Sequence, residues 1–567
     1  MGKKQKIVII GGVAAGPKAA ARARRLLPEA EITIIDRGEL VSYGSCGLPL
    51  MLQGMVPGLD ALTSTTYGLK RDLDWFHHEK DIQFRIRTLA EGIDLKRGEV
   101  SLLDLEDGKS YKLPYDQLVL ATGATPFVPP IPGMDGEGVT VLHHPQDAVR
   151  VHRKVKEGAN RILIIGGGLI GLEVAAALAT PKRQVTVVER EPQLLPGLLD
   201  PELALLVREE METNYVTVRT GEEVAAVETG DEGKMMVHLP GDRLEVDLVI
   251  VACGVRPNVT LAQECGLAIG STGAIAVDEY LRTSDPNIYA AGDCVENKHL
   301  VSGRPVYVPL ASTANKQGRV VGSNLAGLKE TFPGIMGTGV FQVFELNGGK
   351  TGLTEKEALQ MGYPVITGFT AGLDSAHYYP LHGHGVIKLV ACAETKRLLG
   401  AQVVGPGELI KRLDVFSTAI QLGATMEQVA GLDLGYAPPF ATPIDMGLHA
   451  VNTLRNKTQG WLHSVSLREF KELLDSNPEL LILDVRTPEE VEDNPLSFDN
   501  QLRIPLYELR GRLGEVPKGK KIITVCQLGI RGYEAQRILT GAGFDDVSVL
   551  EGGVYGLPKS MLEEGCL

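Results

Sequence analysis

Apolar runs and Gly-rich turns recur along this chain in a fixed order. Residues 7–10 (IVII) form an apolar run typical of a buried strand, and after it come glycines, an Ala-rich helical pattern and a second apolar run that ends in Asp36. The same order returns at 161–190, where the second run ends in Glu189. This alternation is typical of βαβ units, so the sequence predicts two dinucleotide-binding units with parallel sheets.

A second pair of related segments indicates how these units are connected. An apolar strand that ends in Gly and is followed by a proline-containing segment is predicted both at 115–133 and at 246–258. Residues 283–294 again show an apolar strand followed by a Gly-Asp pair, a pattern similar to that of the first unit. We therefore expect the second unit to be inserted into the first.

The pattern changes twice in the second half of the chain. A strand is predicted at 400–405 and an amphipathic helix at 409–423, whereas the proline pair in 436–440 excludes regular structure there. Beyond residue 461 comes another α/β unit, with strands at 480–486 and 521–527. The predicted fold is thus α/β, with two Rossmann-like domains, an α+β domain and a C-terminal α/β domain. The expected boundaries are 1–150 and 271–330 for the two parts of the first domain, 151–270 for the second, 331–455 for the third and 463–567 for the last.

Composition narrows the class of protein. The chain has 567 residues, of which 44% are hydrophobic and 66 are glycines, as suits tight βα turns. A net charge of −14 and only 5% aromatic residues argue against nucleic acid as a partner. No apolar stretch reaches the ~18 residues of a membrane span. Seven scattered cysteines without a CxxC pair indicate a reducing compartment, and we expect the cytoplasm.

The second Gly-rich turn carries a complete G-x-G-x-x-G. Gly166, Gly168 and Gly171 allow backbone N–H groups to approach a pyrophosphate at a helix N-terminus. A carboxylate at the position of Glu189 accepts from a ribose 2′-hydroxyl and repels a 2′-phosphate, which favours NADH. Arg190 beside it favours NADPH instead.

The first turn is less regular, because Val13 stands where the middle glycine is expected. Asp36 and the later Asp293, which suits a ribityl hydroxyl, nevertheless support a nucleotide site. Together these motifs make residues 1 to about 450 resemble the pyridine nucleotide–disulfide oxidoreductases. The resemblance implies FAD in the first domain, NADH in the second, and a dimerisation domain that forms a homodimer.

The resemblance also implies individual cofactor contacts. For FAD these are Gly11, Gly12, Gly16, Asp36, Arg37, Ala121, Thr122, Gly123, Asp293 and Pro309. For NADH they are Gly166, Gly168, Leu169, Ile170, Gly171, Glu189 and Gly254.

Cys46, in the segment SYGSCGLP, has no second cysteine close by in the sequence. In this family the segment lies along the flavin, where a helix N-terminus or positive neighbours can lower the pKa of a thiol. A single thiol must pair with an external sulfur or with oxygen, as a mixed disulfide, a persulfide or a sulfenic acid. Two subfamilies therefore stay open: NADH oxidases and peroxidases, and coenzyme A disulfide or persulfide reductases.

The first helical pattern favours the second subfamily. Helical spacing places Lys18, Arg22 and Arg25 on one face, where they suit the phosphates of a long anionic substrate. The resemblance implies that this substrate is coenzyme A, because the coenzyme A reductases carry substrate-binding basic residues in the same helix. No histidine precedes Pro28, whereas the peroxidase group has one near the start of this helix. The resemblance adds Ser42 and Ser45 to the coenzyme A site, with Ser45 in the place of the usual asparagine.

Two tyrosines resemble those that complete the active site across the dimer in this subfamily. They are Tyr378, in HYYP, and Tyr436, in YAPPF. A phenol at such a position can protonate a leaving thiolate or hydrosulfide.

The last unit resembles a rhodanese domain. Between a predicted strand and a predicted helix, Cys526 is followed by four residues and Arg531, a loop sized for a persulfide or thiosulfate sulfur. The usual Gly-His-Ile-Pro-Gly-Ala segment is replaced by NPLSFDNQLRIP. A sulfur carrier is of use to a sulfur-reducing enzyme and of none to a peroxide-reducing one.

These observations predict a flavoprotein that reduces coenzyme A persulfide, polysulfide or disulfide with NADH through Cys46, with sulfur delivered by Cys526. One alternative is an NADH oxidase or peroxidase that uses a sulfenic acid. Another is a non-catalytic protein for sulfur trafficking or redox sensing. We expect no metal site, since His382 and His384 lie in a predicted turn.

Overall fold

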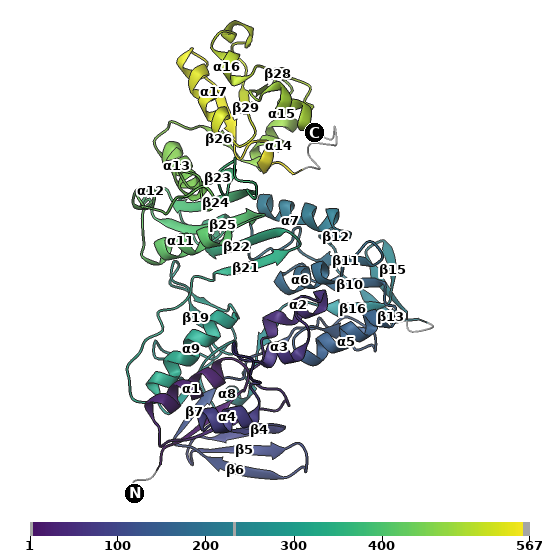
Figure 1. Ribbon diagram of the computed structural model, residues 1–567, viewed down its shortest axis with the longest axis vertical. Coiled ribbons are helices and arrows are strands. Elements are labelled where there is room, and N and C mark those ends of the chain that lie inside the picture. Colours follow the sequence, from purple (N-terminus) through teal and green to yellow (C-terminus); the bar gives the residue numbers. More distant parts are fainter. Residues whose placement is uncertain (1–3, 231–233, 559–567) are drawn as a thin grey trace. The chain divides into compact units, whose positions relative to one another are not determined.

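The computed structural model describes residues 4–230 and 234–558, which form two compact units (Figure 1). The first unit comprises the chain up to residue 190 together with 222–335, and the second comprises 191–221 together with the chain from 336 onwards. Cys566 and the end of the predicted last domain lie outside the described residues.

A parallel sheet in the order β18-β7-β1-β2-β3 forms the first dinucleotide domain. Its strands are Ile288–Ala290, Gln117–Leu120, Lys6–Ile10, Glu31–Ile35 and Gln83–Arg85. β18 comes from beyond the second domain and pairs with β7, which confirms the predicted insertion. Helices α1 (Ala15–Leu26) and α9 (Ala311–Asn324) pack against each other.

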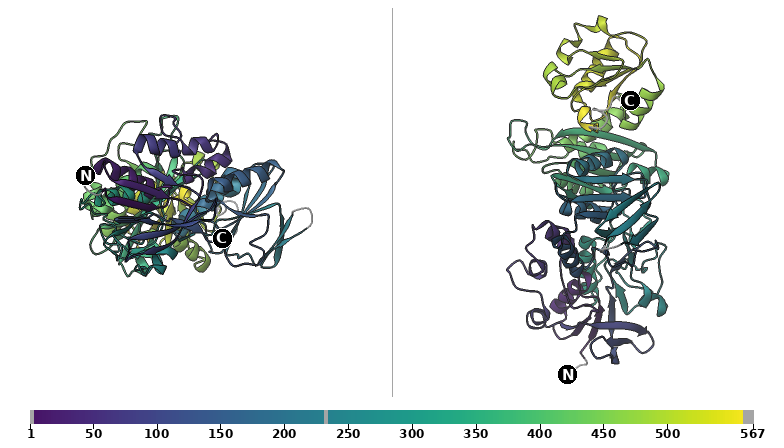
Figure 2. Two further views of the ribbon diagram at one scale, coloured as in Figure 1. Left: turned by 90° about the horizontal axis from the view of Figure 1, so that it is seen from below. Right: turned by 90° about the vertical axis from the view of Figure 1, so that its right-hand side faces the viewer.

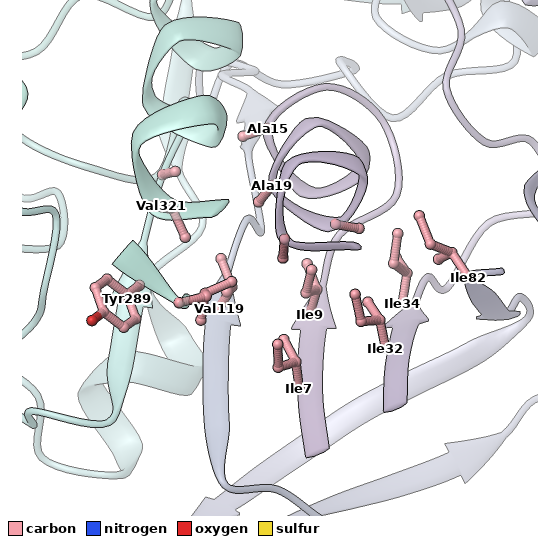
Figure 3. Packing of buried hydrophobic residues seen from close by; sticks show 14 of the residues in the cluster. Ile7, Ile9, Ala15, Ala19, Ile32, Ile34, Ile82, Val119, Tyr289 and Val321 are labelled. Atoms are coloured by element: carbon pink, nitrogen blue, oxygen red, sulfur yellow. The ribbon is translucent and has the colours of Figure 1, made fainter. Parts of the chain in front are cut away.

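The core of this domain lies between the sheet and α1 (Figure 3). Ile7, Ile9 and Ile34 are fully buried, and each such side chain contributes about 1.5–3 kcal/mol. α1 presents small residues to them, among them Ala15 and Ala19, because a short side chain lets the helix approach the strands.

The second dinucleotide domain repeats this plan. Strands β11 (Gln184–Glu189), β10 (Arg161–Ile165), β16 (Leu248–Val251) and β9 (Val139–Val141) lie in this order in a parallel sheet. The helices are α5 (Pro145–Lys156) and α6 (Leu169–Leu178). The proline-containing exits predicted from the sequence pair with each other as β8 (Ala124–Pro126) and β17 (Val255–Pro257).

Each dinucleotide domain also carries a small antiparallel sheet that the sequence analysis missed. One consists of β4 (Thr88–Asp94), β5 (Glu99–Asp104) and β6 (Ser110–Pro114). The other consists of β13 (Ala226–Thr229), β14 (Met235–Leu239) and β15 (Asp242–Val246). The remaining elements of this unit are η1 (Ser45–Gly47), α2 (Leu48–Gln53), α3 (Leu59–Thr63), α4 (Leu73–Lys80), α8 (Thr260–Glu264), β19 (Asn297–Lys298) and β20 (Pro305–Val306).

The second unit begins with α7 (Pro201–Thr213) and β12 (Val216–Thr220) and contains an antiparallel sheet in the order β21-β22-β25-β24-β23. These strands are Gly339–Val343, Leu346–Gly352, Leu398–Gly405, His384–Cys392 and Val365–Leu373. The helices are α10 (Glu355–Gln360), α11 (Ile410–Gln421), α12 (Met426–Ala430) and α13 (Met446–Thr458). β25 and α11 confirm the predicted strand and helix, and 436–440 is irregular as expected.

A buried lysine ties α7 to this sheet. Nζ of Lys388, in β24, lies 3.1 Å from Oδ2 of Asp200 and 2.6 Å from Oε2 of Glu355, and it also bonds to Glu202. Although burial disfavours the ammonium, these three carboxylates together raise the pKa of Lys388. Gln402 completes the cluster by donating to Asp200 (2.6 Å).

The last domain is a parallel sheet in the order β26-β30-β29-β27-β28 with helices on both faces (Figure 2). Its strands are Ser464–Val465, Val547–Leu550, Ile522–Val525, Leu481–Asp484 and Gln501–Arg503. Its helices are α14 (Leu467–Ser476), α15 (Pro488–Asp493), α16 (Leu506–Leu509), η3 (Leu513–Glu515), α17 (Ile530–Gly541) and η4 (Val554–Gly556). Within the described parts of both units, no helix is long and apolar enough to cross a membrane.

Candidate functional site

The two Gly-rich turns have the same geometry. Gly11 has φ +118° and Gly166 has φ +112°, in the region that favours glycine. A Cβ on Gly16 would lie 2.0 Å from the carbonyl oxygen of Gly11, and one on Gly171 would lie 2.0 Å from that of Gly166. These four glycines are therefore required for each helix to start directly against its strand.

In both dinucleotide domains, the carboxylate at the end of the second apolar strand accepts a hydrogen bond from the Gly-rich turn of the same domain. Asp36 accepts from the N–H of Gly12 (2.7 Å) through Oδ2, and Glu189 accepts from the N–H of Gly167 (2.6 Å) through Oε2. The structure thus brings each carboxylate to the turn where a nucleotide ribose is expected. Arg37 is exposed beside Asp36.

Gly168 shows that the second turn has room for a ligand. A Cβ built on Gly168 meets no protein atom within 4 Å, and its φ of −83° is open to any residue. Packing within the protein therefore does not explain this glycine, whereas close approach of a pyrophosphate does. Leu169 and Ile170 open α6 directly after it, and Ile170 is exposed. The residues present fit a dinucleotide.

β7 and β16 run parallel to β1 and β10, so they end at the same edge of each sheet as the Gly-rich turns. The residues that follow these two strands include other predicted cofactor contacts. Ala121 follows β7, and its N–H donates to the carbonyl of Ile10 (2.8 Å). Gly123 and Gly254 occupy matching places after β7 and β16, with φ +67° and +88° and open space around a built Cβ. The hydroxyl of Thr122, which lies between Ala121 and Gly123, donates to the carbonyl of Asn258 (2.7 Å).

Asp293 lies after β18, where the sequence predicts a ribityl-binding carboxylate. Burial raises the pKa of Asp293, and no charged partner offsets this among the described side chains that act on it. The hydroxyl of Tyr307 donates to the carbonyl of Asp293 (2.9 Å), and Pro309 follows Tyr307 shortly before α9. A buried carboxyl of this kind fits a hydroxyl-rich ligand.

Cys46 lies in η1, directly before α2. The segment is joined to the first turn, because the buried Ser42, at φ 49°, donates its N–H to the carbonyl of Gly12 (2.8 Å). The structure contradicts the expected lowering of the thiol pKa. Burial and the nearby Glu173 raise the pKa of Cys46, whereas the neighbouring hydroxyl of Ser45 lowers it.

Glu173 is a functional candidate that sequence reasoning missed. It lies in α6, and burial raises its pKa to about 7. The signal was present, since Glu173 is the one charged residue in the helix sequence LIGLEVAAAL. A carboxyl that titrates near neutrality beside a reactive thiol is a candidate for proton transfer.

The three predicted cations of α1 differ in their surroundings. Lys18 and Arg25 are exposed, whereas the Nε of Arg22 donates to the hydroxyl of Ser323 in α9 (2.9 Å). The glycines of α9 let the stems of Lys18 and Arg22 pack closely, because a Cβ on Gly318 would lie 2.9 Å from that of Lys18. α1 thus presents two exposed basic side chains, and the guanidinium of Arg22 is held in place by Ser323.

The two predicted tyrosines are brought together in the second unit. Tyr378 and Tyr436 are both exposed, and the neighbouring phenol of Tyr378 raises the pKa of Tyr436. They are 58 positions apart in the sequence, so their adjacency results from the fold of this unit.

Cys526 lies at the end of β29, in a loop that leads into α17. Its side chain is buried, and its sulfur accepts from the N–H of Gly529 (3.0 Å), whose φ is +97°. Arg531, in the first turn of α17, forms an ion pair with Glu490 of α15 through two bonds of 2.8 and 2.5 Å. The loop is thus preorganised around the sulfur, but the charge of its arginine is already balanced.

In the part of the chain that the structure describes, the other cysteines and histidines form no further reactive or metal-binding centre. Cys294 is buried and its thiol contacts backbone carbonyls, and burial raises the pKa of Cys253 to about 11. The rings of His382 and His384 are 5.9 Å apart. Within residues 4–230 and 234–558, no group of three or more His, Cys, Asp or Glu side chains has the arrangement of a metal site.

Three protein-family models match successive parts of the chain. Residues 5–318 match "Pyridine nucleotide-disulphide oxidoreductase", which is more than half of the chain. The chain belongs to this family. Residues 340–446 match the dimerisation domain of these oxidoreductases, and residues 466–557 match a rhodanese-like domain. This pyridine nucleotide-disulphide oxidoreductase is therefore an NAD(P)H-dependent flavoprotein enzyme with a C-terminal rhodanese-like domain.

Individual relatives add detail. A CoA-dependent NAD(P)H sulfur oxidoreductase from Pyrococcus furiosus is 39% identical, over 77% of this chain and 96% of the relative. An NADH oxidase from Methanocaldococcus jannaschii is 34% identical, over 80% of this chain and 100% of the relative. The solved structure of a NAD-dependent persulfide reductase from A. fulgidus is 41% identical with a TM-score of 0.93, and the match covers 97% of this chain and 100% of that one.

Proposed function

We propose that this oxidoreductase reduces coenzyme A persulfide or polysulfide, and the related coenzyme A disulfide, with NADH. The observation that carries the proposal is the combination in one chain of a flavin-domain segment with the lone Cys46 and a rhodanese loop with Cys526. The persulfide reductase from A. fulgidus aligns with both parts. Cytoplasmic localisation and a homodimer belong to the same proposal, the latter supported by the dimerisation domain.

The dinucleotide turns would hold the cofactors. Gly11, Gly12, Gly16 and Asp36, with Asp293, fit FAD, and the Gly168 turn with Glu189 fits NADH. Bound FAD supplies two-electron transfer between NADH and a sulfur. A carboxylate at Glu189 would repel the 2′-phosphate of NADPH, whereas Arg190 would reduce this preference.

Cys46 acts as the nucleophile in this proposal. Its thiolate attacks the coenzyme A-side sulfur of the persulfide, so that the S–S bond breaks, a mixed disulfide forms and hydrosulfide leaves. The proton for the leaving sulfur would come from Tyr378 or Tyr436, supplied by the partner subunit as the family resemblance implies. Lys18, Arg22 and Arg25 would bind the phosphates, with Ser42 and Ser45 next to the thiol.

Cys526 supplies sulfur in the same proposal. As a persulfide it would transfer its outer sulfur to the thiol of coenzyme A, with no net oxidation or reduction. The close N–H of Gly529 favours the anionic form of such a sulfur.

An NADH oxidase is the second candidate, favoured by the relative from Methanocaldococcus jannaschii. The match covers all of that relative but only 80% of this chain, so about a fifth of this chain has no counterpart in it. The rhodanese loop is therefore unexplained by an oxidase function.

The test is Cys46→Ser in the full-length enzyme. We expect loss of NADH turnover with coenzyme A persulfide by at least about 100-fold, because the nucleophile is removed. Cys265→Ser is the matched control and should retain turnover, because that thiol bonds to the carbonyl of Ala262 in α8 and belongs to none of the predicted sites. Undiminished persulfide turnover by Cys46→Ser, or faster turnover of oxygen than of persulfide by the unaltered enzyme, would contradict the proposal.

A further inference from the structure

Two arginines of the rhodanese-like domain contact α15, and each is paired with a carboxylate. Arg531 donates to Glu490 twice, from Nη1 to Oε2 (2.8 Å) and from Nη2 to Oε1 (2.5 Å). The buried Arg486 donates to the carbonyl of Glu490 (3.3 Å), and its Nε and Nη2 donate to Asp484 at 2.9 and 2.8 Å. Each positive charge is therefore balanced by a carboxylate of the same domain.

Arg531 lies within electrostatic reach of the reactive sulfur. Its bond to Glu490 makes the largest contribution to raising the pKa of Arg531, and the thiolate of Cys526 and the carboxylate of Asp484 contribute less. The side chains of Arg531 and Glu490 are 30% and 31% exposed, so solvent screens their pair only in part. The two-bond geometry also holds the planar guanidinium in one orientation, away from other anions.

The remaining groups around the sulfur offer an anion no compensation. The four residues between Cys526 and Arg531, QLGI, are uncharged, and Ile530 is exposed. α15, with the sequence PEEVED, carries four carboxylates, and the three other than Glu490 are exposed. The loop is thus apolar where it meets solvent, and the neighbouring helix is negative, which disfavours the approach of a doubly charged anion.

These charges bear on the source of the sulfur, because the length of the loop suits a persulfide and a thiosulfate sulfur alike. Transfer of the outer sulfur of thiosulfate releases sulfite, so two negative charges must be accommodated beside the loop. Transfer from an organic persulfide releases a thiolate with one negative charge. A leaving sulfite would require a cation, and Glu490 already occupies the guanidinium of Arg531.

We propose that Glu490 determines the sulfur donor of Cys526, so that the loop rejects thiosulfate and accepts sulfur from an organic persulfide. The Cys526 thiolate attacks the outer sulfur of the donor R–S–SH, the donor S–S bond breaks, and R–S⁻ leaves as a persulfide forms on Cys526 with no net redox change. The inference rests on the proposed function, in which Cys526 carries sulfur, and it deepens that function by naming the class of donor.

The experiment compares two alkylating reagents of similar size at Cys526 in the full-length enzyme. Iodoacetate is negatively charged and iodoacetamide is neutral, and mass spectrometry quantifies the alkylated Cys526 peptide. Each rate is divided by the rate of the same reagent with 2-mercaptoethanol, and the charge ratio is the corrected iodoacetate rate over the corrected iodoacetamide rate. A change in the ionisation of the thiol cancels in this ratio. We expect Glu490→Gln to raise the charge ratio about tenfold, because Arg531 loses its negative partner.

The chosen substitution retains the cap of α15. Oε2 of Glu490 accepts from the N–H of Thr487 (3.0 Å), and a glutamine oxygen can accept the same bond. Glu492→Gln is the matched control, because Glu492 is exposed in the same helix and its substitution removes an equal charge without breaking the pair of Arg531 and Glu490. The control should change the charge ratio by less than about twofold.

Three outcomes would overturn the inference. One is an unchanged charge ratio in Glu490→Gln, and another is an equal rise in Glu492→Gln. The third is a charge ratio above one in the unaltered enzyme, since this would show that Arg531 attracts anions despite Glu490. The third measurement needs no variant, so it decides if Glu490→Gln does not fold.

Sulfur transfer provides a second readout. The kcat/KM for transfer from thiosulfate to cyanide should rise about tenfold in Glu490→Gln, and an unchanged value would overturn the assignment of the donor. Loading of Cys526 by 2-hydroxyethyl persulfide, detected as a mass gain of one sulfur atom, is measured separately. Failure of this loading would reject the carrier role in the proposed function without changing the charge ratio.

Discussion

Cys46 lies between two neighbours with opposite effects on its thiol. Burial and the carboxyl of Glu173 raise the pKa of Cys46, whereas the adjacent hydroxyl of Ser45 lowers it. A hydrogen bond to the charged form stabilises a thiolate, and a negative charge nearby destabilises it. Ser45 was the residue in its segment that departs from the family pattern, and its contact gives it a direct role.

We predict that Ser45→Ala raises the pKa of Cys46 and that Glu173→Gln lowers it. Only the thiolate reacts, so at neutral pH the alkylation of Cys46 should slow by several-fold in the first variant and accelerate in the second. The measurement is the iodoacetamide rate at Cys46 against pH, resolved by mass spectrometry.

The effect of Glu173 should also depend on pH. Its own pKa is about 7, so its negative charge is present above that pH and lost below it. The difference between Glu173→Gln and the unaltered protein should therefore grow as the pH rises through 7. Identical profiles for both variants and the unaltered protein would refute these roles.

At the scale of elements, Gly168 and Gly171 of the second turn have different roles. Gly171 is needed by the fold, because its Cβ would lie 2.0 Å from a backbone oxygen, whereas Gly168 faces open space. We predict that Gly171→Ala destabilises the enzyme by about 1–3 kcal/mol or more. Gly168→Ala should leave the melting temperature unchanged and raise KM for NADH by about tenfold, because its methyl group occupies the place of a phosphate.

Thermal unfolding and steady-state kinetics of the two variants provide the measurement. A loss of stability in Gly168→Ala equal to that in Gly171→Ala would show that both glycines serve packing alone.

The buried cluster around Lys388 makes another element-scale prediction. Lys388→Met leaves Asp200, Glu202 and Glu355 together without their cation, and should reduce the free energy of unfolding by about 3–5 kcal/mol. Denaturant unfolding checks this. Lys411→Met is the control, because its exposed pair with Asp414 contributes less than about 1 kcal/mol. Equal stability of the two variants would contradict the assignment.

The elements differ in how far the sequence predicts them. The Gly-rich turns and the apolar strands of the parallel sheets have strong local patterns, so 7–10 and 161–165 were recognised. The small antiparallel sheets were missed because strands such as β6, with the sequence SYKLP, are short and half-exposed. The charge of Glu173 within an apolar helix is visible in the sequence, but its place beside Cys46 depends on a contact between distant segments, which no local pattern reports.

At the scale of the whole molecule, the rhodanese-like domain and the flavin domains should be separable in function. We predict that Cys526→Ala retains NADH turnover with preformed coenzyme A persulfide, and loses at least about tenfold when sulfur must be passed from Cys526 to coenzyme A. Stopped-flow measurement of NADH consumption with the two kinds of substrate checks this. Equal losses with both substrates would indicate that Cys526 supports structure, and equal retention would remove it from the pathway.

The place of β18 in the first sheet has a consequence for how the chain is made. Tyr289 of this strand packs in the same core as Ile9, although the whole second dinucleotide domain separates them in sequence (Figure 3). During synthesis the first domain therefore cannot close until the ribosome has passed β18 and α9, whereas the inserted domain has all its parallel strands by Val251. The N-terminal domain is thus completed after the domain inserted in it. Until β18 is synthesised, the edge of β7 has no partner strand and is open to pairing with other chains.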